Sequence, residues 1–442
     1  MVAGLATATP SEKIKLNGTF EVRACEGIED CPDWNLKVAK PWTVPFDGGL
    51  HPNALNPKGC PAISNVWERG VFNVPVGWSK DILHLKFDAL GSDCIVFVNG
   101  KRLAHLGLLS GEVDITGTTK DGENELLVYA SRTYTDMPRT AEEDILRGDS
   151  IFEPKDFLQR RLGVERPGSY GQGGGGIWLR RSPRECGLES VKVVTSWREK
   201  KVRLEIDTVA KDERLFGLGA RKFLLFFTAS IPHGNTFAFS REVEVADGRG
   251  RIVVEEPWEN PVLWDLYRGN VYDGSVMIVD GARLVDVKTF KFGFREVWAE
   301  GRDIRLNGHV VPFHPEMNWL KLDTETLGTW RELGLNTFYW QPHLSAWAQW
   351  GVRPIYPEDA IDLCDREGLL CFLPTYPSLH TKVWQDPRYD ALYTEIAREH
   401  MSRYWNHPSV MGWTISMNCF NPKDSIHPDT LGRRSDYRIG QG

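Results

Sequence analysis

The chain has 442 residues, of which 41% are hydrophobic and 26% are charged, and its formal net charge at pH 7 is −7. This length and hydrophobic fraction are typical of a folded protein with two or three domains. The acidic balance argues against a phosphate-tracking surface, so no nucleic-acid partner is expected. Seventeen tryptophans are a high number, and their rings suit the apolar faces of sugars as well as they suit protein cores.

The N-terminal segment and the cysteines give no sign of export, membrane insertion or metal binding. Residues 1–10 lack the basic start and apolar core of a signal peptide, and no segment approaches the ~20 apolar residues of a membrane span. We therefore expect no membrane partner, and either a cytoplasmic protein or a secreted one whose true start is missing. The eight cysteines form no zinc-type spacing, so neither a metal nor another cofactor is predicted. Cys25 and Cys31 are close enough to bridge in an oxidising compartment, but free thiols are the favoured interpretation.

The first half of the chain has the pattern of a β-sandwich. From about residue 16 to 194, short alternating segments are separated by turns rich in Gly, Pro and Asp, which favours an antiparallel sandwich. Residues 85–90 and 95–101 alternate clearly, and Asn99-Gly100 is typical of a tight hairpin turn. Residues 136–176 form a charged, Gly-rich insertion. A loop is favoured there over a phosphate cradle, because no Lys-Ser/Thr pair follows the glycines.

A second sandwich is predicted after residue 196. Residues 202–207, 242–245 and 252–254 alternate in the same way, and no long helical pattern interrupts them. A region of this size fits an immunoglobulin-like sandwich, although the Cys-Trp-Cys signature of antibody domains is absent.

The pattern changes near Val311 to strands and helices in alternation, which predicts a parallel sheet. Pro357 begins one of these helices and Gly368 ends it. The predicted helices are residues 323–333, 357–367 and 391–405, and the predicted strands lie near Val311 and at residues 337–340, 369–373 and 410–415.

Three segments carry a family resemblance. Residues 67–75 read Trp-Glu-Arg-Gly-Val-Phe-Asn-Val-Pro, residues 291–297 read Lys-Phe-Gly-Phe-Arg-Glu-Val, and residues 407–418 read His-Pro-Ser-Val-Met-Gly-Trp-Thr-Ile-Ser-Met-Asn. Together with shorter matches between them, they resemble in the same order motifs of glycoside hydrolase family 2, the family of β-galactosidases, β-glucuronidases and β-mannosidases.

The resemblance implies a multidomain fold of β plus α/β class. A galactose-binding-like jelly-roll sandwich is expected over residues 1–195, an immunoglobulin-like β-sandwich over residues 196–296, and the N-terminal half of a TIM (β/α)8 barrel over residues 297–442. The last region is too short for the ~250 residues of a whole barrel, so an incomplete barrel is predicted. A half barrel leaves a hydrophobic parallel edge, which favours a fragment of a longer protein.

The resemblance also implies catalytic positions. Aligned without gaps, Asn418 takes the place of the family's acid/base Glu, and the nucleophile Glu of strand seven has no counterpart. Retaining glycosidases need two carboxyl groups ~5 Å apart, and an Asn side chain has no acidic proton to donate. The candidate replacements are Asp424 in the same loop and Glu316 after the predicted first strand, with Asp429 a further carboxylate in reach.

Ligands of parallel barrels lie above the C-terminal ends of the strands, where polar and aromatic residues of this chain are predicted to face a sugar. These predicted substrate-binding residues are His314, Trp340, His343, Tyr376 and His380.

Two functions follow from the sequence. The first is a family 2 glycoside hydrolase that cleaves O-glycosyl bonds of β-linked sugars in carbohydrate metabolism, here as a fragment that lacks the nucleophile strand and is inactive alone. The alternative is a non-catalytic carbohydrate-binding or scaffolding protein derived from that family, which Asn418 favours. Fold analogy does not decide between them, whereas the downstream reading frame would. A carbohydrate is the expected partner, and a homo-oligomer is compatible with the sequence.

Overall fold

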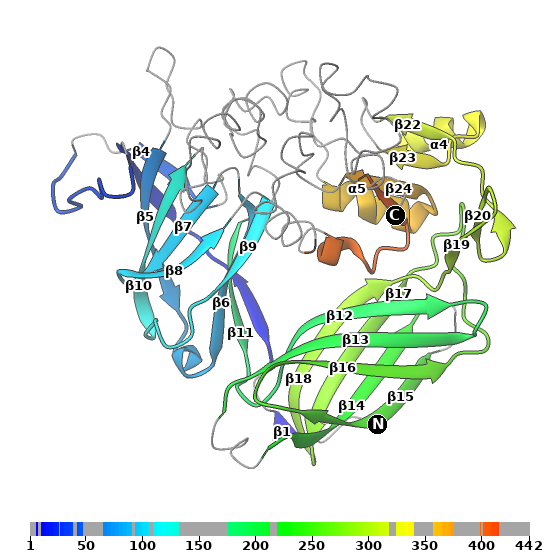
Figure 1. The fold of residues 1–442 in the computed structure, drawn as a ribbon, viewed down its shortest axis with the longest axis horizontal. Coiled ribbons are helices and arrows are strands. Elements are labelled where there is room, and N and C mark those ends of the chain that lie inside the picture. The colour runs from blue at the N-terminus through cyan, green and yellow to red at the C-terminus, as the bar shows by residue number, and fades with distance from the viewer. Residues whose placement is uncertain are drawn as a thin grey trace, which may run out of the picture.

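The computed structural model contains two β-sandwiches followed by a small parallel sheet with helices (Figure 1). The residues that the structure describes are 6–7, 10–25, 27–38, 42–46, 65–90, 93–106, 109–131, 176–212, 219–232, 234, 236–317, 324–339, 357–374, 398 and 401–414. Within these ranges, no helix is long and apolar enough to cross a membrane.

The first sandwich has one six-stranded and one four-stranded sheet. The strands are β2 (Glu12–Lys15), β3 (Thr19–Cys25), β4 (Trp42–Pro45), β5 (Asn65–Val74), β6 (Ile82–Leu90), β7 (Asp93–Val98), β8 (Lys101–Leu106), β9 (Leu109–Asp114), β10 (Gly122–Ser131) and β11 (Ile177–Ser182). The sheet orders are β4-β3-β5-β10-β7-β8 and β2-β11-β6-β9. Alternate residues such as Phe72 and Val74 of β5 point between the sheets and form one hydrophobic core with Leu126 and Val128 of β10.

The predicted hairpin at Asn99-Gly100 is confirmed. These residues connect β7 to β8, and their φ angles are 49° and 78°. Both lie in the left-handed region that a two-residue type I′ turn requires, which Asn and Gly adopt at the lowest cost.

The second sandwich also has two sheets around one core. Its strands are β12 (Gly187–Ser196), β13 (Lys201–Ala210), β14 (Arg221–Ser230), β15 (Phe237–Val245), β16 (Gly248–Pro257), β17 (Tyr272–Asp280) and β18 (Arg283–Phe292), with β1 (Ala6–Thr7) paired to β18. The sheet orders are β12-β13-β16 and β1-β18-β17-β14-β15. Aromatic rings fill the space between them, with Trp258 stacked on Phe237 at 3.9 Å and Tyr272 stacked on Phe292 at 5.3 Å.

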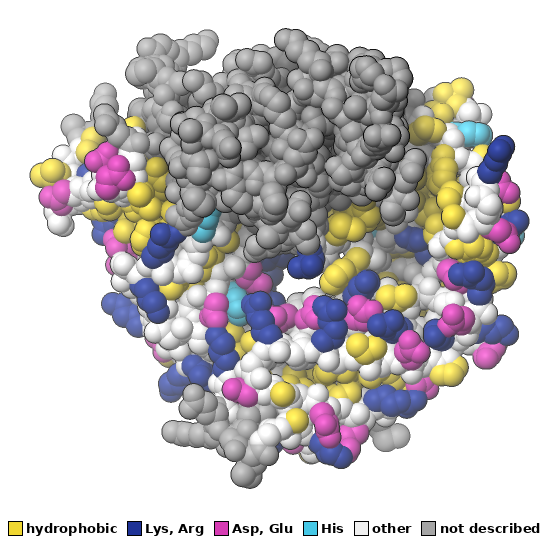
Figure 2. Space-filling view, in the orientation of Figure 1, with side chains coloured by type: hydrophobic (Ala, Val, Ile, Leu, Met, Phe, Trp, Pro, Cys, Tyr) yellow, Lys and Arg dark blue, Asp and Glu magenta, His cyan; other side chains and the backbone are white. Residues whose placement is uncertain are grey.

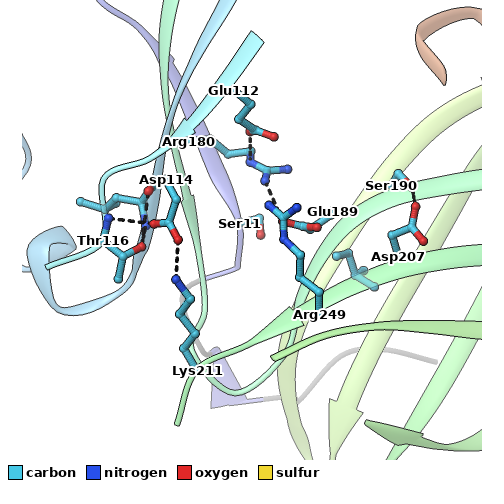
Figure 3. Close-up of polar contacts among 12 residues, drawn as sticks. Ser11, Glu112, Asp114, Thr116, Arg180, Glu189, Ser190, Asp207, Lys211 and Arg249 are labelled. Atoms are coloured by element: carbon cyan, nitrogen blue, oxygen red, sulfur yellow. Dashed lines mark hydrogen bonds and ion pairs between the residues drawn. The ribbon is translucent and has the colours of Figure 1, made fainter. Parts of the chain in front are cut away.

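Polar contacts join the two sandwiches. The buried carboxylate of Asp286 in β18 accepts hydrogen bonds from the backbone N–H of Ser11 at 2.6 Å and of Leu188 at 2.7 Å. Figure 3 shows Arg180 of β11 between two carboxylates, 3.0 Å from Glu112 of β9 and 3.5 Å from Glu189 of β12. The Ser11–Asp286 and Arg180–Glu189 contacts thus connect the first sandwich to the second.

A short antiparallel sheet leads from the second sandwich to the parallel sheet. Its strands are β19 (Val297–Glu300), β20 (Asp303–Leu306) and β21 (His309–Val310). The side chain of Asn307, in the turn after β20, donates to the carbonyl oxygen of Trp264 at 2.8 Å. Trp264 is fully buried with Leu306, Val311 and Leu370 in a core that joins this sheet to the parallel one.

The parallel sheet has the order β22-β23-β24-β25. Its strands are β22 (Pro315–Met317), β23 (Thr337–Tyr339), β24 (Leu370–Pro374) and β25 (Val410–Thr414), and its helices are α4 (Thr324–Leu333) and α5 (Pro357–Glu367). Helix α5 ends at Gly368, whose φ is 68°, where the N–H of Leu369 returns to the carbonyl oxygen of Cys364 at 2.9 Å. The predicted elements at 323–333, 337–340, 357–367, 369–373 and 410–415 are thus confirmed to within one or two residues.

Two predicted elements, the helix at 391–405 and the first parallel strand, differ from the prediction or are only partly described. The helix predicted at 391–405 is described only at residues 398 and 401–405, of which 398 and 401–404 are helical and 405 is in a turn. The first parallel strand begins at Pro315 and not near Val311, because the N–H of Val311 bonds to the carbonyl oxygen of Ile304 at 2.9 Å and its side chain enters the core around Trp264. The assignment of this region to the N-terminal half of a (β/α)8 barrel, and the division of the chain at 195/196 and 296/297, stay predictions.

Candidate active-site edge of the parallel sheet

The carboxyl ends of the four parallel strands lie along one edge of their sheet. Met317 of β22 pairs with Tyr339 of β23, which pairs with Phe372 of β24, and Pro374 pairs with Thr414 at the end of β25. The segments that follow these strands therefore leave the sheet from the same edge, which is where parallel α/β folds place their ligands. We call this the candidate active-site edge.

Most of the predicted site residues lie outside the described part of the chain. In the sequence, each of them follows β23, β24 or β25; they are Trp340, His343, Tyr376, His380, Asn418 and Asp424. Glu316 lies within β22, opposite Phe338, but its side chain also lies outside the described part. The roles of all these residues stay predictions.

His314 is described, and it does not lie at the candidate active-site edge. It directly precedes β22, and its Nδ1 atom lies 2.9 Å from the carbonyl oxygen of Gly334, in the turn that leads into β23. Its backbone N–H donates to Asn336 Oδ1 at 2.9 Å. The ring is therefore at the opposite end of the sheet from the predicted rim. The difference arises because β22 begins four residues later than the pattern indicated, which turns a residue expected after the strand into one before it.

A buried carboxylate holds the start of β25, the strand that leads towards Asn418. Asp365 at the end of α5 accepts hydrogen bonds from the backbone N–H of Ser409 at 2.9 Å and from the ring of His407 at 2.6 Å. Arg295 adds a third contact, because its Nη2 donates to the carbonyl oxygen of Val410 at 2.5 Å. Burial lowers the pKa of Arg295 to about 10, and the charge of Asp365 opposes this shift, so the guanidinium stays positive at neutral pH.

The strand is also connected to the second sandwich. The side-chain amide of Asn406 accepts a hydrogen bond from the N–H of Val193 at 2.8 Å and donates to the carbonyl oxygen of Val191 at 2.6 Å. The amide thus forms hydrogen bonds with one N–H group and one carbonyl group on the edge of β12, as the backbone of a neighbouring strand would.

Close packing sets the register of β25 on β24. Cys371 pairs with Val410 but Phe372 pairs with Gly412, so Met411 is an extra residue on β25. A Cβ atom on Gly412 would lie 2.7 Å from the ring of Phe372, closer than carbon atoms pack. Sequence reasoning assigned no role to Arg295, Asp365 or Asn406. Arg295 lies in the Gly-Phe-Arg motif and Asn406 directly precedes the His-Pro-Ser motif, whereas no sequence signal marks Asp365.

Three potential metal ligands gather beside this strand. Within the described ranges, the ligand atoms of Asp362, Asp365 and His407 lie within 4.8 Å of one another. However, both carboxylate oxygens of Asp365 already accept hydrogen bonds, and the Asp362 side chain is 61% exposed. This chemistry fits a hydrogen bond that orients His407, and it adds nothing in favour of a metal.

Comparisons with known proteins were made over the whole chain. No protein-family model matches it. A β-galactosidase of Leuconostoc mesenteroides is 22% identical over 449 residues, which cover 90% of this chain and 39% of the relative. A protein of Formosa agariphila, provisionally named a β-glucuronidase, is 22% identical over 412 residues, which cover 87% of this chain and 34% of the relative. The chain thus spans less than half the length of these curated relatives.

Solved structures agree on the fold. The β-glucuronidase of Bacteroides uniformis superposes with a TM-score of 0.62 at 18% identity, over 91% of this chain and 46% of that one. The β-D-mannosidase of Dictyoglomus thermophilum gives 0.63 at 18% identity, over 91% and 52%. A glycosyl hydrolase family 2 member from Bacteroides cellulosilyticus gives 0.61 at 15% identity, over 92% and 52%. The curated relatives and the solved structures together confirm the predicted resemblance of this chain to glycoside hydrolase family 2.

Proposed function

We propose that this chain supplies the N-terminal sandwiches and the first part of the barrel of a family 2 glycoside hydrolase that cleaves β-linked sugars. The observation that carries the proposal is the parallel sheet: the strand with the His-Pro-Ser-Val motif, β25, lies beside β24 in parallel register and ends at the edge shared with β22 and β23. Partial coverage of the relatives supports a chain that is one part of a longer enzyme.

In this proposal, the loops after the four strands hold the sugar, and Asn418 occupies the position of the acid/base. An amide is able to bind a sugar hydroxyl but not to protonate a leaving group. Asp424, which follows the same strand in the sequence, is the proposed replacement acid. It would need a raised pKa, which partial burial near the sugar would give. The nucleophile would come from a carboxylate on a later strand.

The second candidate function is sugar binding without hydrolysis. The alignment of Asn418 with the acid/base Glu favours it, because a binding protein derived from a hydrolase keeps the folds and loses the catalytic carboxylates. It would hold a β-linked saccharide at the same edge.

Assays on the product of the complete open reading frame that contains this chain distinguish hydrolysis from sugar binding without hydrolysis. We expect the complete product to hydrolyse 4-nitrophenyl β-glycosides and the 442-residue chain alone to release no nitrophenol. Asp424→Asn in the complete product should abolish hydrolysis and leave sugar binding intact, whereas Asp429→Asn, at the other candidate carboxylate after the same strand, should leave both unchanged. A complete product that binds saccharides but hydrolyses none of the glucuronide, galactoside and mannoside would establish the second candidate.

A further inference from the structure

A pocket of about 480 Å³ lies between the second sandwich and the start of β25. Its walls come from β12, the start of β13 and the turn between them, from Glu255 of β16, from residues 292–297 at and after the end of β18, and from residues 405–408. The predicted catalytic residues follow the other end of β25 in the sequence. The pocket is therefore distinct from the candidate active-site edge.

One wall of the pocket is aromatic. The half-buried indole of Trp405 lines it, and the ammonium of Lys192 lies 5.4 Å from the centre of the ring. The next residue, Asn406, is fixed to the edge of β12 by two hydrogen bonds. The backbone next to Trp405 is thus anchored to β12 before any ligand arrives, which limits the entropy lost when the indole is ordered on binding.

The rest of the lining alternates in charge. Lys201 contacts the carboxylates of Glu199 at 2.6 Å and Glu255 at 3.3 Å. Glu296 accepts hydrogen bonds from the backbone N–H of Arg198 at 2.9 Å and from the hydroxyl of Ser196 at 3.0 Å. Figure 2 shows a similar mixture of basic and acidic side chains over the visible face of the second sandwich. The pocket therefore presents many donors and acceptors without a strong excess of either charge.

This lining selects among ligand classes. A phosphate, a carboxylate or an amine would each lie close to both the glutamates Glu255 and Glu296 and the lysines Lys192 and Lys201, so attraction and repulsion would largely cancel and no charged ligand is favoured. A hydroxyl group donates to a carboxylate and accepts from an ammonium, so a neutral polyol satisfies both kinds of group at once. The C–H face of a sugar ring also packs well on an indole, and the pocket volume is within the ~300–1,000 Å³ of small-ligand sites.

We propose that this pocket is a second carbohydrate-binding site, which holds a neutral mono- or disaccharide unit against Trp405. It goes beyond the proposed hydrolytic function, because it uses no catalytic carboxylate and lies away from the candidate active-site edge. Such a site would keep a chain of sugars attached to the protein while another part of it occupies that edge.

Saturation-transfer NMR on the 442-residue chain, with lactose and cellobiose as probes, tests the site. We expect transfer to the ring C–H protons of at least one probe. Trp405→Ala should weaken that binding by about tenfold, which corresponds to ~1.4 kcal/mol, the upper range for a stacking contact. Trp405→Phe should retain most of it. The matched control is Trp197→Ala: Trp197 is 40% exposed, lies in the turn between β12 and β13, and does not line the pocket.

A second variant covers the case in which Trp405→Ala does not fold. Val194 lines the pocket and is 39% exposed, so Val194→Trp should fill the pocket without disturbing the core, and should also abolish transfer. No transfer in the wild-type chain, or equal transfer in wild type, Trp405→Ala and Val194→Trp, would overturn the proposal. Equal transfer would instead place the sugar elsewhere, for example at the candidate active-site edge, and would leave the proposed hydrolase function standing.

Discussion

The ring of His407 lies 2.6 Å from the carboxylate of Asp365, and that carboxylate also accepts the backbone N–H of Ser409 at 2.9 Å. The pair connects the end of α5 to the first residues of β25. Asp365 is 5% exposed, so its carboxylate oxygens are satisfied by these two hydrogen-bond partners and not by water. This carboxylate is therefore one of the contacts that hold the start of β25, together with those of Arg295 and Asn406.

Asp365→Asn tests this dependence. The amide keeps the shape of the side chain but removes the charge that His407 and Ser409 bind, which should lower the free energy of unfolding by about 2–3 kcal/mol. Urea unfolding followed by tryptophan fluorescence measures the change. Asp362→Asn is the matched control, because its carboxylate is 61% exposed and 3.8 Å from the ring, and it should change stability by less than about 0.5 kcal/mol. Equal losses in both variants would contradict the role given to Asp365.

Asn406 should control how firmly the second sandwich holds the same strand. Asn406→Ala removes the two hydrogen bonds to the edge of β12, and we expect it to cost about 1–2 kcal/mol and to speed exchange of the Val193 amide proton. Asn406→Asp keeps the acceptor for Val193 but loses the donor for Val191, so only the variant with alanine should expose the Val193 amide. Native-state hydrogen exchange measures this difference. Unchanged Val193 exchange in Asn406→Ala would show that β12 does not need the amide.

Local patterns predicted the elements that are built by neighbouring residues. The Asn99-Gly100 hairpin and the helix Pro357–Glu367, which Gly368 terminates, each depend on backbone preferences of one or two residues, which the sequence displays directly. The contacts that hold β25 connect residues far apart, such as Asn406 and Val193, and no local preference indicates them. The predicted start of the first parallel strand is wrong for the same reason. The N–H of Val311 bonds to the carbonyl oxygen of Ile304 and its side chain packs against Trp264, and no local pattern indicates either contact.

The thiols of Cys364 and Cys371 should be unreactive in the folded protein. Both are fully buried between α5 and β24, and burial raises the pKa of Cys371 well above its usual value, with Cys364 nearby adding to the shift. The reagent has no access to either buried sulfur, and at Cys371 burial also disfavours the reactive thiolate, so neither thiol should react with Ellman's reagent at pH 8 until urea unfolds the protein. Exposed Cys31 should react at once and serves as the internal control. Mass spectrometry of alkylated peptides locates the labels, and early labelling at Cys364 or Cys371 would show that the sheet opens readily.

Glu68 should make the first sandwich less stable as the pH rises. It lies in β5 with its side chain fully buried, and among the described residues neither carboxylate oxygen has a hydrogen-bond partner. Burial raises the pKa of Glu68 from its usual 4.5 to about 8, so the folded protein holds a proton that the unfolded chain releases near pH 4.5. The stability that this proton contributes is complete below pH 4.5 and is lost as the pH rises towards 8.

Linkage gives the size of the effect and the test. Between pH 4.5 and 8, the contribution of Glu68 to the free energy of unfolding should fall by about 1.4 kcal/mol for each pH unit. Glu68→Gln cannot ionise, so it should remove this slope and be more stable than the wild type at pH 8. Glu123→Gln, at an exposed position of β10, is the matched control and should leave the slope as it is, because water solvates that carboxylate in both states. Urea unfolding at pH 5, 6.5 and 8 measures all three proteins. A slope in Glu68→Gln equal to that of the wild type would mean that Glu68 finds a partner for its charge in the folded protein.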